Sequence, residues 1–102
     1  MRFDGHRILL VEDNEINREI ACELLSSRGL IVETACDGVE AFERFRQSKN
    51  GYYELILMDI QMPKMNGYDF CRAIRNLSGE YAANIPIIAL TANIFRDEIL
   101  SL

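Results

Sequence analysis

Four short runs of apolar residues recur along the chain, and a segment with helical spacing follows each of them. The runs at Ile8–Val11, Leu55–Met58 and Ile87–Leu90 are wholly apolar. Continuous runs of this length are typical of strands that are covered on both faces of a sheet. The run at Ile31–Ala35 is interrupted by two polar residues, so it favours a strand at the edge of the sheet.

The segment after the first run predicts an amphipathic helix. Its apolar residues recur at helical spacing, at Ile16, Ile20, Leu24 and Leu25. Asn14 is placed to cap the amino end of this helix, and Gly29 is placed to end it.

Three further helices are predicted. Asp37 caps the second helix, which carries Val39, Phe42 and Phe45 on one face, and the Asn50-Gly51 turn follows it. After a loop at residues 61–67, a third helix carries Phe70, Ile74 and Leu77 on one stripe. Pro86 precedes the fourth strand, and a last helix is expected from Phe95 to Leu102.

The predicted order is therefore βαβαβαβα within one domain of 102 residues. Strands that alternate with amphipathic helices imply a parallel sheet with right-handed crossovers and helices on both faces. We predict a doubly wound α/β fold.

Composition excludes several classes of function. A net charge of −5 argues against nucleic-acid binding, which needs a basic face. No apolar run is long enough to cross a membrane, so direct membrane contact is not expected. Cys22, Cys36 and Cys71 are odd in number and lack metal-ligand spacing, which favours buried thiols in a reducing, cytoplasmic compartment.

Polar residues follow three of the predicted strands at their carboxyl ends. Glu12 and Asp13 follow the first strand, Asp59 the third and Thr91 the fourth. Ligands of doubly wound sheets bind beyond these ends. If the first and third strands are neighbours, the three carboxylates and the hydroxyl converge on one crevice.

Three carboxylates at one place repel one another unless a cation lies among them. Oxygen ligands favour Mg²⁺ or Mn²⁺, and an aspartate held beside such an ion is a plausible phosphoryl acceptor. Taken singly, Asp59 and Thr91 are better explained as turn or cap residues, and Glu12-Asp13 equally well as the start of a loop; their joint placement at three strand ends raises the metal site to an equal alternative. Spacing alone leaves both interpretations open.

Three local segments resemble the signature segments of response-regulator receiver domains. They are Ile8–Asn14, Leu57–Gly67 and Ile88–Ala92, and the run Asn14–Arg18 is most similar to receivers of hybrid sensor histidine kinases. The resemblance implies the flavodoxin-like receiver fold, with strand order 2-1-3-4 here and a fifth strand at the end of the family's sheet.

The resemblance also implies a role for each site residue. Asp59 is expected to accept a phosphoryl group from a phosphohistidine. Glu12, Asp13, Asp59 and the backbone carbonyl of Gln61 are expected to hold Mg²⁺. Thr91 is expected to be the switch hydroxyl that bonds a phosphoryl oxygen.

The implied partner is a histidine kinase or a histidine phosphotransfer protein. In the family such a partner docks on the first helix, so the exposed side around Ile16, Asn17 and Ile20 is the expected contact. Ile20 lies in the apolar stripe, which favours a core position for it.

The chain departs from the family at its carboxyl end. It stops within the predicted last helix, without the fifth strand, its helix and the lysine that pairs with phosphate. Lys49 and Lys64 are not placed to replace that lysine. The fourth strand then becomes an edge, so we expect self-association through this strand or through the last helix.

Three other functions are weighed against the phosphoacceptor. An aspartyl phosphatase would need a second Asp where Gln61 stands. A flavin or nucleotide site would need a Ser/Thr/Gly-rich loop after the first strand, where Glu12 and Asp13 would instead repel phosphate. A receiver that serves for interaction or oligomerisation without phosphorylation is the stronger competitor, because the lysine is missing.

Overall fold

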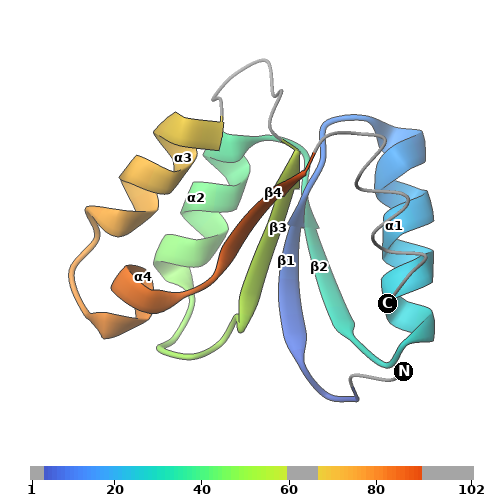
Figure 1. Ribbon diagram of the computed structural model, residues 1–102, viewed down its shortest axis with the longest axis horizontal. Coiled ribbons are helices and arrows are strands. Elements are labelled where there is room, and N and C mark those ends of the chain that lie inside the picture. The colour runs from blue at the N-terminus through green and yellow to red at the C-terminus, as the bar shows by residue number, and fades with distance from the viewer. Residues whose placement is uncertain (1–3, 60–66, 91–102) are drawn as a thin grey trace.

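The computed structural model of the protein describes residues 4–59 and 67–90. The strands and helices of these residues follow one another in the order β1 (Arg7–Val11), α1 (Glu15–Ser27), β2 (Ile31–Ala35), α2 (Gly38–Gln47), β3 (Leu55–Asp59), α3 (Gly67–Arg75), α4 (Glu80–Asn84) and β4 (Ile87–Leu90). Figure 1 shows the four strands side by side, with their carboxyl ends at the top of the view.

The four strands form one parallel sheet in the order β2-β1-β3-β4. This confirms the predicted α/β fold and strand order, including the place of β2 at an edge. The register sets Val11 of β1 opposite Ala35 of β2 and Met58 of β3. Strands β1 and β3 are therefore direct neighbours, which is the condition for their carboxyl ends to share a crevice.

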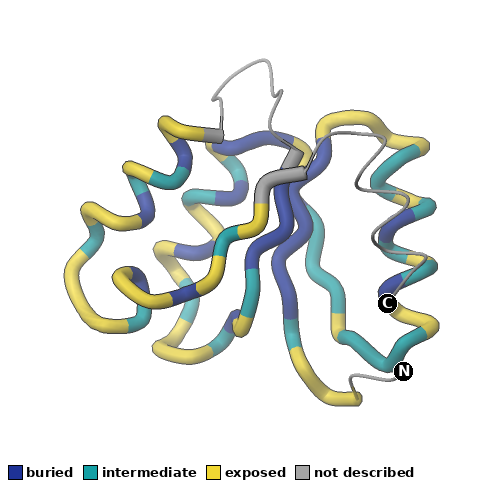
Figure 2. The backbone as a smooth tube through the Cα atoms, in the orientation of Figure 1, coloured by how far each residue is buried: buried dark blue, intermediate teal, exposed yellow. Residues whose placement is uncertain are grey.

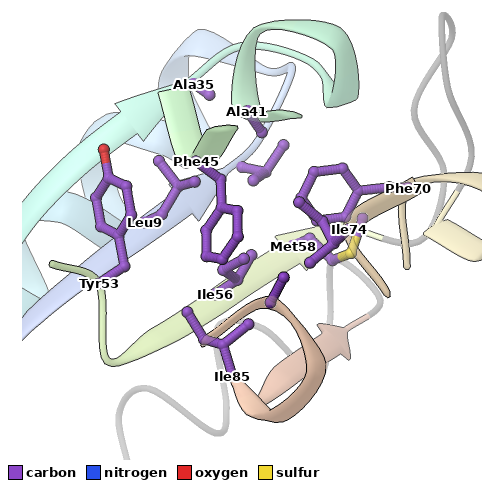
Figure 3. Packing of buried hydrophobic residues seen from close by; sticks show 12 residues of the cluster. Leu9, Ala35, Ala41, Phe45, Tyr53, Ile56, Met58, Phe70, Ile74 and Ile85 are labelled. Atoms are coloured by element: carbon purple, nitrogen blue, oxygen red, sulfur yellow. The ribbon is translucent and has the colours of Figure 1, made fainter. Parts of the chain in front are cut away.

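Alternate residues of β1 face the two sides of the sheet. Ile8 and Leu10 pack with Leu57 of β3 against Ala21 and Leu25 of α1. Leu9 and Val11 face the other side, where α2, α3 and α4 cover the sheet (Figures 1 and 3). Burial on both faces explains why Ile8–Val11 of β1 and Leu55–Met58 of β3 are apolar (Figure 2).

The larger of the two cores lies under α2 and α3. Figure 3 shows Phe45 of α2 and Phe70 of α3 pointing toward Ile56 and Met58 of β3. Ile85, just before β4, closes the same cluster. This side of the sheet needs large side chains because three helices pack against it.

The predicted helix caps are confirmed. The Asn14 side chain accepts a hydrogen bond from the Asn17 N–H (3.0 Å), and the Asp37 side chain accepts one from the Glu40 N–H (2.8 Å). Gly29 follows α1 with φ of +90°, a conformation that favours glycine and ends the helix.

Three expectations from the sequence are corrected. The short helix α4 was not predicted, because five residues between Gly79 and Ile85 are too few to show a period. Val39 is 47% exposed, since it lies on the first turn of α2 beyond the edge of the core. Cys36 is exposed, with its thiol donating to Glu40, whereas Cys22 and Cys71 are partly buried.

Other predicted elements fall outside the described residues. They are the loop at 61–66, with Lys64, and the last helix at 95–102. No helix in the part of the chain that the structure describes is both long and apolar enough to cross a membrane.

Candidate functional site

The acidic loop, residues 12–14, leaves the carboxyl end of β1 in a fixed conformation. The Glu12 N–H donates to the Ala35 carbonyl (3.1 Å), which extends the pairing with β2 by one residue. The Glu12 side chain is only 1% exposed, and its Oε1 accepts from the Asn14 N–H (3.1 Å). Asp13, in contrast, is exposed. The loop thus buries one carboxylate and presents the next one to solvent.

Asp59 lies next to this loop at the level of the backbone. It is the last residue of β3, and the Val11–Met58 register makes Glu12 and Asp59 the next positions on neighbouring strands. The backbone of Asp59 is also opposite Leu90, the last residue of β4. The strand ends that carry the predicted acids are therefore adjacent in the sheet.

The remaining parts of the predicted site lie outside the described residues. They are the side chain of Asp59, together with Gln61 and Thr91. Among the side chains that the structure describes, no three of His, Cys, Asp or Glu form a group that could hold a metal ion. The acidic loop after β1 carries Glu12 and Asp13, whose carboxylates are hard oxygen ligands of the type that suits Mg²⁺.

A pocket of about 490 Å³ lies at the opposite, amino-terminal side of the sheet. Its lining includes Glu33, Arg44, Lys49, Tyr52 and Tyr53. Glu33, Tyr52 and Tyr53 are accounted for by hydrogen bonds with one another, so the pocket is a poor candidate for the functional site.

Those contacts form an aromatic cluster, which we define as Arg7, Glu33, Tyr52 and Tyr53. The Glu33 carboxylate accepts hydrogen bonds from the hydroxyls of Tyr52 and Tyr53, the latter at 2.9 Å. Arg7 Nε lies 3.5 Å from Glu33, and its guanidinium lies 4.1 Å from the centre of the Tyr52 ring. A network of this kind anchors the loop before β3 to the edge strand β2.

The pKa values of the aromatic cluster report this pairing. Burial acts to raise the pKa of Glu33, but the hydrogen bonds from Tyr52 and Tyr53 and the charges of Arg7 and Arg44 outweigh it and lower the pKa. Burial, and then the hydrogen bond to Glu33, raise the pKa of Tyr53. At neutral pH, both shifts favour an ionised Glu33 that accepts hydrogen bonds from protonated tyrosine hydroxyls.

Arg18 was not predicted as a site residue, although it contacts the acidic loop. Its guanidinium Nη1 donates to the Glu12 carbonyl at 3.0 Å, in a part-buried position. An arginine four residues into a helix usually faces solvent, so the sequence pattern alone holds no signal for this contact.

The exposed side of α1 agrees with the expected docking surface in one respect. Ile16 is 68% exposed, so it is not a core residue, while Asn17 and Ile20 are partly buried. Ile20 is therefore not the fully buried core residue that its place in the apolar stripe favoured.

The chain matches the family model "Response regulator receiver domain" over residues 8–101. It belongs to that family. Among curated proteins, it is 39% identical over 99 residues to the peroxide stress-activated histidine kinase mak1 of Schizosaccharomyces pombe. That alignment covers 95% of this chain and 6% of the kinase, so the chain corresponds to a small part of that relative.

Two solved structures extend the comparison. The receiver domain of sensor histidine kinase PA1611 from Pseudomonas aeruginosa, with a magnesium ion in its active site cleft, is 38% identical with a TM-score of 0.77, over 95% of this chain and 78% of that one. The Ssk1 receiver domain of Saccharomyces cerevisiae in complex with the phosphotransfer protein Ypd1 gives 32% identity and a TM-score of 0.66, over 74% of this chain and 50% of that one. Both confirm the receiver fold, and curated relatives of Dictyostelium discoideum that are hybrid signal transduction histidine kinases confirm the resemblance to hybrid-kinase receivers.

Proposed function

We propose that this receiver domain accepts a phosphoryl group on Asp59 from a phosphohistidine of a partner protein. The observation that carries the proposal is the parallel β1–β3 register, which makes Asp59 the strand-end neighbour of the acidic loop. An aspartate that ends a strand next to an acidic loop has the chemistry for phosphoryl transfer with a divalent cation.

The cation of this site would be Mg²⁺, with Mn²⁺ as a possible substitute. Glu12, Asp13, Asp59 and the backbone carbonyl of Gln61 would hold it. The PA1611 receiver domain, with magnesium in its active site cleft, supports this choice. The bound ion would supply positive charge to offset the negative charge of the phosphoryl group and the carboxylates.

The chain's own residues would perform the transfer. A carboxylate oxygen of Asp59 forms the new O–P bond while the N–P bond to the donor imidazole breaks, and the electron pair of that bond stays on the imidazole nitrogen. The hydroxyl of Thr91 donates a hydrogen bond to a phosphoryl oxygen. Turnover at Asp59 is limited to promoting its own phosphorylation and dephosphorylation, so the domain is not a conventional enzyme.

The partner would be a histidine kinase or a histidine phosphotransfer protein. The Ssk1 receiver domain, crystallised with Ypd1, supports a partner of the second kind. We place the contact on α1 around Ile16, Asn17 and Ile20, because Ile16 offers an exposed apolar side chain close to the carboxyl end of the sheet. The free thiols of the chain suit a cytoplasmic setting for this exchange.

Intact mass spectrometry after incubation with acetyl phosphate and Mg²⁺ tests the proposal. We expect one added phosphoryl group on the wild-type protein and none on Asp59→Asn. Asp69→Asn makes the same chemical change on α3 and should retain the adduct. An adduct that persists in Asp59→Asn, or no adduct on the wild-type protein, would refute the assignment.

A second candidate function is self-association without phosphorylation. In the described sheet β4 pairs with β3 alone, and Ile88 of β4 is 43% exposed. Light scattering over a concentration series should then show dimers that Ile88→Lys disrupts. A monomer at every concentration would rule this candidate out.

A further inference from the structure

Arg18 holds the acidic loop from two directions. Its backbone N–H donates to the Asn14 carbonyl (2.9 Å), and its guanidinium donates to the Glu12 carbonyl (3.0 Å). Asp13 lies between these two anchored carbonyls. One residue of α1 therefore fixes the backbone on both sides of the exposed carboxylate.

The loop has further ties that define its shape. The Glu12 N–H is bonded to Ala35 of β2, and Glu12 Oε1 accepts from the Asn14 N–H. These bonds fix the Glu12 amide and its side chain, but the Glu12 carbonyl lies beyond the end of the β1 ladder. The guanidinium supplies a donor to that carbonyl, which would otherwise have to be satisfied in another way at a part-buried position.

We propose that Arg18 is a positioning residue, which orients Glu12 and Asp13 for the divalent cation through its hydrogen bond to the Glu12 carbonyl. This inference rests on the proposed function. The Asn14 cap alone is enough to start α1, so the guanidinium contact is not needed for the helix. Its effect falls on the loop, whose backbone must hold both carboxylates at the strand end before the ion arrives.

The charge of Arg18 acts in the same direction. A guanidinium beside the loop reduces the repulsion between Glu12 and Asp13 while the ion is absent. Lysine would keep this charge but offers a compact ammonium on a flexible stem in place of a planar fork. Replacement by lysine therefore separates the role of the charge from the role of the directed hydrogen bond.

The test compares Arg18→Met and Arg18→Lys with a control, Arg46→Met. Arg46 pairs with Glu43 on its own helix, α2, and is exposed. Titration calorimetry would give the Mg²⁺ dissociation constant of each variant. We expect it to rise about three- to tenfold in Arg18→Met, less in Arg18→Lys, and not at all in Arg46→Met.

A second readout needs no metal. Amide hydrogen exchange in the metal-free protein should become faster at Glu12 and Asn14 in Arg18→Met, and stay unchanged at Leu9 in the middle of β1. Thermal unfolding of the same samples shows whether each variant is folded.

The outcomes separate the two claims. If the wild-type protein binds Mg²⁺ and Arg18→Met binds it equally well, Arg18 is a structural residue and the inference is wrong, even where the thermal midpoint falls. If the wild-type protein does not bind Mg²⁺, the proposed metal site fails first, and the positioning role fails with it. Unchanged exchange at Glu12 and Asn14 would also overturn the positioning role.

Discussion

Two regions of the sheet use carboxylates in opposite ways. In the aromatic cluster, side chains stabilise the ionised carboxylate of Glu33, since it accepts hydrogen bonds from two phenol hydroxyls and lies beside a guanidinium. At the carboxyl end, backbone groups and Arg18 fix the acidic loop, and Asp13 remains exposed. The carboxylate of Glu33 already has its hydrogen-bond and charge partners within the protein, so it has little affinity left for a ligand. The acidic loop, in contrast, holds carboxylates that a cation can bind.

This difference shows that burial and charge alone do not identify a functional carboxylate. Glu12 is more deeply buried than Glu33, yet Glu12 belongs to the candidate site. What separates the two residues is the kind of partner that holds them and their place in the sheet, since Glu33 lies in the middle of β2 and Glu12 lies just beyond the carboxyl end of β1. The following variants test that distinction, starting with the largest expected effect.

The double variant Glu12→Gln/Asp13→Asn should weaken Mg²⁺ binding about a hundredfold or more, because two anionic oxygen ligands are replaced by neutral amides. Glu33→Gln is the matched control and should bind Mg²⁺ as the wild-type protein does. Calorimetric titration at pH 7 measures both. An equal loss of Mg²⁺ affinity in the two variants would show that the acidic loop and Glu33 do not differ in cation binding.

Glu33→Gln should instead lower the free energy of unfolding by about 2 kcal/mol at pH 7, since charge-assisted hydrogen bonds from Tyr52 and Tyr53 are weakened. The pKa of Glu33 is lowered in the folded state, so its contribution is complete above the pKa of an unfolded carboxyl group and is lost as pH falls through the folded value. Denaturant unfolding at pH 7 and pH 3 should therefore show a smaller difference at the acidic pH. A difference that does not depend on pH would contradict the ionised pairing.

Tyr53→Phe should cost about 1 kcal/mol at neutral pH, because it removes one of the two hydroxyls that Glu33 accepts from and leaves the ring in the core. The pKa of Tyr53 is raised, so this contribution is complete below the pKa of an unfolded tyrosine and is lost as pH rises through the folded value. Urea unfolding of variant and wild type at pH 7 and pH 10.5 would measure the trend. A larger difference at the alkaline pH would be the wrong sign.

Arg46→Met should change neither stability nor Mg²⁺ affinity measurably. The Arg46–Glu43 pair is exposed on α2, and such pairs contribute little because water and salt screen them. Thermal unfolding in low and high salt is the measurement. A clear loss of stability at low salt would show that this exposed ion pair stabilises the fold more than its exposure suggests.

Much of this architecture could be predicted from local pattern. The apolar runs predicted all four strands, and Asn14 and Asp37 were recognised as caps because their side chains act on N–H groups three residues away. The helix α4 was missed since it is short, and Val39 was misplaced because helical spacing does not show where a core ends. Contacts between distant segments, such as Tyr81 with Ser48 and with the Tyr53 N–H, leave no periodic signal.

The sequence by itself determined the class of fold, the family, and Glu12, Asp13 and Asp59 as candidate acids, because strand runs and the residues that end them are local features. Only the tertiary structure decided the register of β1 against β3, which of these acids is buried, and that Arg18 reaches back to the Glu12 carbonyl. These facts depend on register and on where a helix crosses a sheet. Both are set by the packing of residues far apart in the chain, which no local pattern records.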